Sequence, residues 1–474
     1  MRIRFLLLLV IVFYYSSCFS QNVVIEDFNK LFEKPDYMNA ITGFQVIDVE
    51  TGQELVAVNP EKLFIPASVL KIVTSATALE ILGADYRFKT QIGYTGSIKD
   101  NELIGDLVVY SGGDPTFWSS FFPENDFLAE WIRKIREAGI RKISGNIIFD
   151  GSAYYSEEIP PTWIWGDIGN YYGAYFDPFT NHDNYFTINF KSGNTGELTE
   201  IISTTPVIND LKIDNRVIAS DNNSDNAYVY GSPFDKNRLI RGTIPNGKEK
   251  FSIKASMPEP AVLFGIMLEN AIKTGEIDFS GSTFLKSIEN SDFNLIHCHS
   301  SPTLDIIIKV LNYESVNLFA EHLLVHLGLE KNKNGSRVAG IKVIENFWKE
   351  KGLNSQSLVM EDGSGLSHFN IVSPSFLNQV LKHMFQSKNN EIFIKSLPSA
   401  GEGTLKSFGK ISFPGYSLRA KSGSMTRIRS YSGYLDCDSE RKVAFTIMIN
   451  HFSGSQSQIR SAIEQLLISV KKNY

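Results

Sequence analysis

Hydrophobic residues recur at helical spacing in five segments of the chain. In the first, which follows Pro66, apolar side chains are spaced three or four residues apart until Gly83, a residue type that commonly ends a helix. The same spacing predicts four further helices. The five expected ranges are 68–82, 127–138, 259–273, 304–327 and 456–470.

Strand patterns lie between these helices. Short alternating or buried apolar runs, bounded by turn residues, predict strands within residues 87–110, 143–149 and 443–450. A longer series of such runs, residues 181–256, is broken by Gly, Asn and Asp. We expect this series to form a β-rich domain of its own.

The N-terminus has the composition of a secretory signal. Arg2 and Arg4 precede a short apolar run, residues 5–15, and small residues follow it. That run is shorter than the roughly 20 residues that cross a membrane, so we expect no stable transmembrane anchor. Cleavage after Ser20 is predicted, which gives an exported, periplasmic protein. Lipidation on Cys18 is not favoured, because Tyr15 stands where an aliphatic residue is usual.

Composition narrows the function classes. The chain of 474 residues has a formal net charge of -6, and loss of Arg2 and Arg4 with the signal would make it -8. An acidic protein is a poor nucleic-acid binder, so no nucleic acid is expected as a partner. Cys298 and Cys437 would remain after cleavage, and the sequence leaves open whether they pair.

Three short motifs carry the candidate chemistry. Ser68 precedes Lys71 by three residues, which places a hydroxyl and an amine on one face of a helix. A partly desolvated lysine at that distance can act as the base for a serine nucleophile. Ser315-Val316-Asn317 and Lys421-Ser422-Gly423 follow, and S-x-x-K, S-x-N and K-[ST]-G in this order are the signature of penicillin-recognising serine enzymes.

The spacing of the motifs predicts insertions. Ser315 follows Ser68 by 247 positions, far more than a compact single-domain enzyme of this kind needs. We therefore expect whole domains between the nucleophile and the second motif, and a discontinuous catalytic domain.

At this point the chain resembles the serine D-alanyl-D-alanine carboxypeptidases/endopeptidases of the penicillin-binding protein 4 type, the S13 peptidases. Beyond the three motifs, the segments that carry the resemblance are 105–109, 112–116, 145–150, 172–174, 362–367, 401–405 and 432–435. The resemblance implies an α+β fold, in which a transpeptidase/β-lactamase-like antiparallel sheet flanked by helices is interrupted by two smaller domains. One departure is Ser422, where the family usually has threonine; it keeps the hydroxyl.

The resemblance also implies domain bounds, partners and substrates. The expected bounds are 1–20 for the signal peptide, 21–92 with 292–474 for the catalytic domain, 93–164 with 249–291 for an inserted α/β domain, and 165–248 for an inserted β-rich domain. The expected partners are peptidoglycan stem peptides and β-lactams. The substrate would be the D-alanyl-D-alanine end, or a D-alanyl-diamino-acid cross-link.

Individual roles follow from the resemblance. Ser68 would be the acylating nucleophile and Lys71 its base. Ser315 would relay a proton to the leaving amine, and Asn317 would hold the substrate amide and brace Lys71. Lys421 would supply positive potential for the substrate carboxylate. The remaining expected contacts are Ser422 to that carboxylate, Gly423 where a side chain would obstruct the substrate, and the backbone amides of Ser68 and Ser424 as the oxyanion hole.

Two further positions have a purely structural explanation beside the functional one. Met425 would line the side-chain pocket, although core packing explains it equally well. Asp150 would meet the amino group of a diamino acid, although an aspartate before Gly151 is also typical of a turn.

No metal and no cofactor are expected. His322 and His326 lie one helical turn apart, but Leu323 stands where H-E-x-x-H enzymes carry the glutamate. His297 and His299 flank Cys298 on a predicted strand, and two histidines alone do not make a site. Two other functions stay open: a β-lactamase of the same superfamily, and a catalytically idle wall-binding protein.

Overall fold

The computed structural model describes residues 23–123, 126–154, 159–288 and 293–474. The predicted signal peptide, residues 1–20, lies outside them. The described residues form two compact units, the first within residues 23–84, 304–316 and 341–474, and the second within residues 85–303 and 317–340. None of the helices in the described part of the chain is both long and apolar enough to span a membrane.

The first unit is built on one antiparallel sheet. Its strand order is β2-β1-β22-β21-β20, and a two-stranded ladder, β18 with β19, lies apart from it. The strands are β1 (Ile41–Asp48), β2 (Glu54–Val58), β18 (Leu358–Val359), β19 (Ile371–Val372), β20 (Leu418–Met425), β21 (Ile428–Asp436) and β22 (Lys442–Asn450). The helices are α2 (Lys71–Leu82), α6 (Leu304–Glu314), α8 (Arg337–Glu350), α9 (Pro374–Gln386), α10 (Asn390–Ser396) and α11 (Gln456–Asn473), the first residues of α8 belonging to the second unit.

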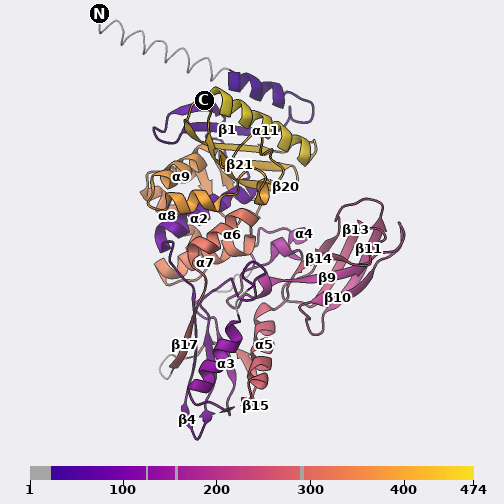
Figure 1. Cartoon of the computed structure of the whole chain (residues 1–474), viewed down its shortest axis with the longest axis vertical. Helices are drawn as coiled ribbons and strands as arrows, with labels where there is room; N and C mark the ends of the chain where they lie inside the picture. Colours follow the sequence, from indigo (N-terminus) through magenta and orange to yellow (C-terminus); the bar gives the residue numbers. More distant parts are fainter. Residues whose placement is uncertain (1–22, 124–125, 155–158, 289–292) are drawn as a thin grey trace, which may run out of the picture. The chain divides into compact units, whose positions relative to one another are not determined.

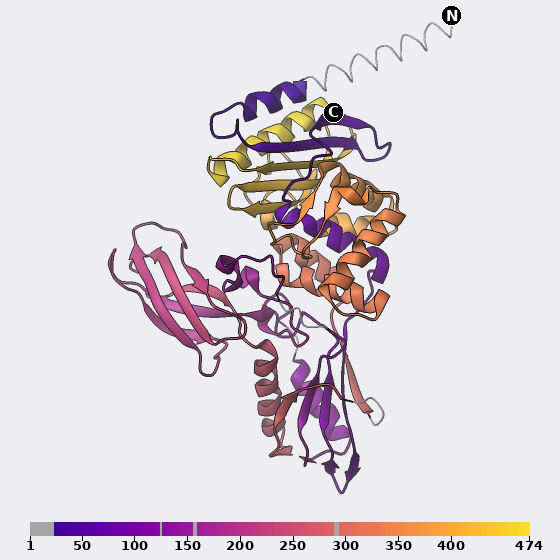
Figure 2. The ribbon, with the colours of Figure 1, turned by 180° about the vertical axis from the view of Figure 1, so that it is seen from behind.

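Alternating side chains give this sheet two buried faces. Phe44 and Tyr431 point into a core shared with α11 and with helical residues 23–32. Thr446 and Tyr434 point to the other face, where they hydrogen-bond to α9. Figures 1 and 2 show α11 on one side of the sheet and α9 with α2 on the other. The antiparallel sheet flanked by helices confirms the predicted α+β class.

The described residues of the second unit form four sheets. Their strand orders are β16-β8-β6-β3-β17, β15-β7-β5-β4, β10-β9-β14 and β11-β13-β12. The strands are β3 (Lys89–Tyr94), β4 (Ser97–Lys99), β5 (Glu102–Ile104), β6 (Leu107–Tyr110), β7 (Lys142–Ile143), β8 (Ile147–Asp150), β9 (Tyr185–Lys191), β10 (Glu200–Thr205), β11 (Lys212–Ser220), β12 (Tyr228–Tyr230), β13 (Asn237–Pro245), β14 (Phe251–Ser256), β15 (Asp278–Phe279), β16 (Thr283–Leu285) and β17 (Asn294–Ser300). The helices are α3 (Phe127–Glu137), α4 (Trp165–Ile168), α5 (Pro260–Thr274) and α7 (Asn317–Asn332).

The strand pairing disagrees with two of the predicted domain bounds. The predicted bound at residue 92 cuts β3, which pairs with β17 and β6 inside the second unit. The predicted bound at residue 248 separates β14 from β9, although the two form one antiparallel ladder. Long-range pairing of this kind leaves no local mark in the sequence. Further division of the second unit stays a prediction.

Two predicted elements were wrong as single elements. The helix expected over 304–327 is interrupted between α6 and α7, where Ser315 has φ +61°, a left-handed conformation that an α-helix cannot contain. The strand expected over 143–149 is two short strands, β7 and β8, in different sheets. The helices expected near 127–138, 259–273 and 456–470 are confirmed as α3, α5 and α11.

Candidate active site

Ser68 lies in a short 3-10 turn, η1 (Ala67–Leu70), that leads directly into α2. Ala67, just before it, has φ +50°, a strained value for a residue with a Cβ. The sheet holds this turn in place, because Ser430 Oγ donates to the Pro66 carbonyl at 2.7 Å and Asn450 Nδ2 donates to the Ile65 carbonyl at 3.2 Å. Ser68 itself is only half-buried, so a substrate can reach its hydroxyl.

Lys71 is the buried partner of Ser68. Its side chain is 0% exposed, and Nζ lies 3.0 Å from Ser68 Oγ. The same Nζ donates to the Ser364 carbonyl at 2.6 Å, which fixes the amine beside the serine. The three-residue spacing therefore produces the contact that the sequence predicted.

The loop that supplies Ser364 is held by a buried carboxylate. Asp362 is 0% exposed and accepts hydrogen bonds from the amides of Gly365 at 2.7 Å and Ser367 at 2.6 Å. Gly365 has φ +84°, and a Cβ there would stand 2.0 Å from the Ala67 carbonyl oxygen. The segment 362–367 is part of the family resemblance, but only the structure shows that it positions Lys71.

Lys421 and Ser315 form a second amine–hydroxyl pair in the first unit. Lys421 Nζ lies 2.8 Å from Ser315 Oγ and donates to the Ser422 carbonyl at 3.0 Å. Lys421 is fully buried. This burial, followed by the nearby charges of Lys71 and Arg429, holds the pKa of Lys421 well below its ordinary value.

Strand β20 passes close to the nucleophile. A Cβ on Gly423 would stand 2.6 Å from the Pro66 carbonyl oxygen and 3.0 Å from Ser68 N. The glycine is thus required by the close approach of β20 to η1, in addition to any demand of the substrate. Ser422 is nearly buried and Ser424 is exposed on the same strand, while the half-buried Met425 accepts from Gln456 Nε2 at its carbonyl, 2.7 Å away.

Two predicted site residues, Asn317 and Asp150, belong to the second unit. Asn317 is the first residue of α7, and its Nδ2 donates to the Tyr172 carbonyl at 2.7 Å. Asp150 is buried at the end of β8, where its two carboxylate oxygens accept from the amides of Ser152 and Ile288, each at 2.9 Å. These contacts give Asp150 the turn role named above, and the substrate roles of both residues stay predictions.

The two pairs of histidines that the sequence analysis considered have different surroundings. His322 is engaged at both ring nitrogens, by Thr180 Oγ1 and by the Gly113 carbonyl, each at 2.8 Å. Within the described ranges, the group of three side chains able to hold a metal ion is Glu130, His297 and His299. Glu130 comes from a distant helix, so the sequence did not associate it with the two histidines.

Comparisons with known proteins agree with the motifs. A model of the D-Ala-D-Ala carboxypeptidase 3 (S13) family matches residues 24–470. The chain is 28% identical to a D-alanyl-D-alanine carboxypeptidase of Actinomadura sp. (strain R39), over 90% of this chain and 81% of that protein. It is 23% identical to the carboxypeptidase DacB of Haemophilus influenzae, over 87% and 85%.

A solved structure shows the same fold. Penicillin-binding protein 4 (dacB) of Haemophilus influenzae superposes with a TM-score of 0.80, at 21% identity, and covers 94% of this chain and 98% of its own. The same protein has also been solved in complex with a β-lactam, which matches this chain with a TM-score of 0.75 at 20% identity, over 94% of this chain and 98% of its own.

Proposed function

The chain belongs to the D-Ala-D-Ala carboxypeptidase 3 (S13) family, and we propose from this premise that it cleaves the D-alanyl-D-alanine end of peptidoglycan stem peptides through an acyl-enzyme on Ser68. The observation that carries this proposal is the contact of Lys71 Nζ with Ser68 Oγ at 3.0 Å, in a turn that leaves the serine half-exposed. A nucleophile and a base within hydrogen-bond reach are the minimum that covalent catalysis requires.

The proposed reaction has two stages, acylation of Ser68 and hydrolysis of the acyl-enzyme. Ser68 Oγ attacks the carbonyl carbon of the penultimate D-alanine, and its proton passes to neutral Lys71 Nζ. The C–N bond then breaks, and the terminal D-alanine leaves as an amine after taking a proton from the Ser315–Lys421 pair, whose atoms lie 2.8 Å apart. Water then attacks the ester carbonyl and gives one proton back to the Ser315–Lys421 pair. The C–O bond to Ser68 breaks, Ser68 Oγ takes back its proton from Lys71, and the acyl group leaves as a carboxylic acid that ionises in solvent.

Binding and charge stabilisation come from β20. Lys421 contributes positive potential, and the Ser422 hydroxyl accounts for recognition of the substrate carboxylate. The close approach of Gly423 to Ser68, where a Cβ would stand 3.0 Å from Ser68 N, supports an oxyanion hole made of the Ser68 and Ser424 amides. Met425 at the end of the strand would line the side-chain pocket.

A β-lactam presents the same reactive amide, so penicillin is the direct test. Intact-mass spectrometry should show one penicilloyl adduct per chain, and the adduct should be absent in Ser68→Ala. Ser457→Ala, an exposed serine of α11, is the matched control and should be acylated like the wild type. An unmodified wild-type chain would contradict the mechanism.

The lifetime of the adduct separates the remaining alternatives. A β-lactamase would release the adduct rapidly and turn over a chromogenic cephalosporin, whereas a DD-peptidase holds it. A catalytically idle wall-binding protein would form no adduct. Release of free D-alanine from a synthetic stem peptide, compared with cleavage of a cross-linked dimer, then divides carboxypeptidase from endopeptidase action.

Periplasmic location is the last part of the proposal, and the short apolar run with Arg2 and Arg4 supports it. N-terminal sequencing of the exported protein should begin at Gln21. Retention of Met1, or a lipid on Cys18, would contradict it.

A further inference from the structure

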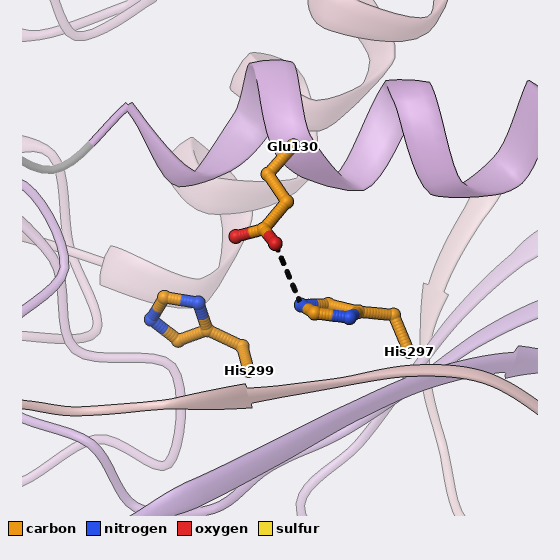
Figure 3. Close-up of side chains that lie close together, drawn as sticks. All are labelled: Glu130, His297 and His299. Atoms are coloured by element: carbon orange, nitrogen blue, oxygen red, sulfur yellow. Dashed lines mark ion pairs between the residues drawn. The ribbon is translucent and has the colours of Figure 1, made fainter.

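Three side chains with metal-ligand chemistry converge in the second unit, apart from the three catalytic motifs. Glu130 lies on α3, and His297 and His299 lie on β17, which is at the edge of its sheet because, among the described strands, it pairs with β3 alone. One ligand atom of each residue lies within 4.8 Å of the others, and His297 Nε2 is 3.8 Å from Glu130 Oε1. Figure 3 shows the carboxylate reaching from the helix toward the two rings on the strand.

The strand geometry explains why both rings face the helix. Residues two apart in a strand point to the same side, so His297 and His299 share one face while Cys298 points to the other. Helix α3 packs against β17 on the histidine face, with Trp131 and Phe127 in contact with the His299 ring at centroid separations of 6.0 and 5.6 Å. The His299 ring is therefore held in place by packing.

Unpartnered nitrogens point to a ligand. Among the described residues, Nε2 of His297 and Nε2 of His299 are buried atoms without a hydrogen-bond partner. Buried polar atoms nearly always have a partner, so two such nitrogens beside one carboxylate need an explanation. An aromatic core role explains the packing of the His299 ring but not the nitrogens or the carboxylate.

We propose that Glu130, His297 and His299 form a zinc site that ties α3 to the edge strand β17. Two imidazoles and one carboxylate are a ligand set that zinc accepts, and nitrogen ligands disfavour magnesium and calcium. In tetrahedral geometry two ligand atoms lie about 3.4 Å apart. The distance from His297 Nε2 to Glu130 Oε1 is 3.8 Å and all three ligand atoms lie within 4.8 Å of one another, so small adjustments of the three side chains would complete the site. Glu130 is 44% exposed and His297 17%, which leaves a fourth position open to water.

The test uses the full chain without a histidine tag, stripped with EDTA and dialysed. Zn²⁺ titration monitored by calorimetry, together with metal analysis, should give one ion per chain. Bound Zn²⁺ should also raise the midpoint of thermal unfolding. Glu130→Gln, which keeps the shape of a partly exposed side chain, should weaken Zn²⁺ binding at least tenfold, and His297→Ala should do the same. Co²⁺ in the same site should give the intense visible absorption of a tetrahedral complex, and Glu130→Gln should reduce it.

Matched controls lie on the same two elements. Glu137→Gln changes another glutamate of α3, and Cys298→Ser changes the residue between the histidines; both should bind Zn²⁺ like the wild type. The proposal is overturned if the wild type binds no zinc, if Glu137→Gln weakens binding as much as Glu130→Gln, or if Mg²⁺ binds equally well. Penicillin acylation of Ser68 should be unchanged in Glu130→Gln, so failure here is distinguishable from failure of the proposed function.

Discussion

Each unit has a buried basic side chain beside a hydroxyl group, but the two hydroxyl groups differ in their exposure to solvent. In the first unit, Lys71 lies 3.0 Å from the hydroxyl of the half-buried Ser68. In the second, His322 Nε2 lies 2.8 Å from the hydroxyl of Thr180, a similar base–alcohol distance. Burial lowers the pKa of His322 to about 3, so its ring is a neutral base at physiological pH.

The difference lies in access to the hydroxyl group. Thr180 is 0% exposed, and its hydroxyl lies within hydrogen-bond distance of both the Asp177 carbonyl, at 2.9 Å, and His322 Nε2, so a substrate cannot reach it. Ser68 is open to a substrate, and Lys71 is fixed by the Ser364 carbonyl. A buried base next to an alcohol is thus not an active site unless a substrate can reach the alcohol.

Replacement of the two bases should give the largest contrast. Lys71→Met removes the amine that accepts the Ser68 proton, and we expect the second-order rate of penicillin acylation to fall about 10³-fold. His322→Gln keeps a hydrogen-bonding side chain and should leave that rate within about threefold. Stopped-flow acylation with a fluorescent penicillin measures both. A comparable loss in His322→Gln would mean that the second unit takes part in the chemistry.

Lys421 should show a smaller and substrate-dependent effect. Lys421→Ala removes positive potential near the substrate carboxylate and disconnects Ser315, so we expect about a 10²-fold loss in kcat/KM for a D-alanyl-D-alanine peptide. Reactive β-lactams need less help with the leaving group, and their acylation should fall less. Steady-state kinetics with the peptide and acylation kinetics with penicillin separate the two. Equal losses would show that the roles of Lys71 and Lys421 are wrongly divided.

Asp114 of the second unit should affect stability rather than acylation. Burial raises the pKa of its carboxyl to about 6, although Thr116 donates two hydrogen bonds to it. The pKa of Asp114 is thus higher in the folded chain than in the unfolded chain. The protonated carboxyl therefore contributes up to ~3 kcal/mol to the free energy of unfolding below pH about 4, and this contribution is lost as the pH rises through about 6.

Asp114→Asn should remove this pH dependence. Urea unfolding at pH 4 and pH 7 should show a smaller difference in the free energy of unfolding than in the wild type. The mutant should be about as stable as the wild type at pH 4, because the protonated carboxyl and the amide are both neutral and Asp114 Oδ2 has no hydrogen-bond partner among the described residues. Asp221→Asn, at an exposed position, is the control and should behave like the wild type. An unchanged pH dependence in Asp114→Asn would mean that this carboxyl is ionised in the folded state.

Deletion of the β-rich segment should have the smallest effect on acylation. Met257 N donates to the Asn184 carbonyl at 2.8 Å, so the ends of residues 185–256 are adjacent and a Gly-Ser-Gly linker can join them. No proposed catalytic group lies within these residues, and penicillin labelling of Ser68 should persist. Loss of labelling in a variant that still unfolds cooperatively would show that this segment helps to shape the active site. Cleavage of cross-linked wall fragments is the second readout.

Local features of the sequence determined the nucleophile and much of the secondary structure. The contact of Ser68 with Lys71 needs only a three-residue spacing at the start of a helix, and helical periodicity located α3, α5 and α11. The three motifs, in their order along the chain, also identified the family, because they contain the reactive side chains.

Tertiary structure decided everything that depends on distant segments. Lys421 meets Ser315 only because β20 and the end of α6 are brought together, and Lys71 meets the Ser364 carbonyl only because the 362–367 loop folds onto η1. The interruption of the helix at Ser315 and the proximity of Glu130 to His297 also depend on tertiary packing. Periodicity specifies which face of an element is buried, but the partner that covers it is set by packing across the whole chain.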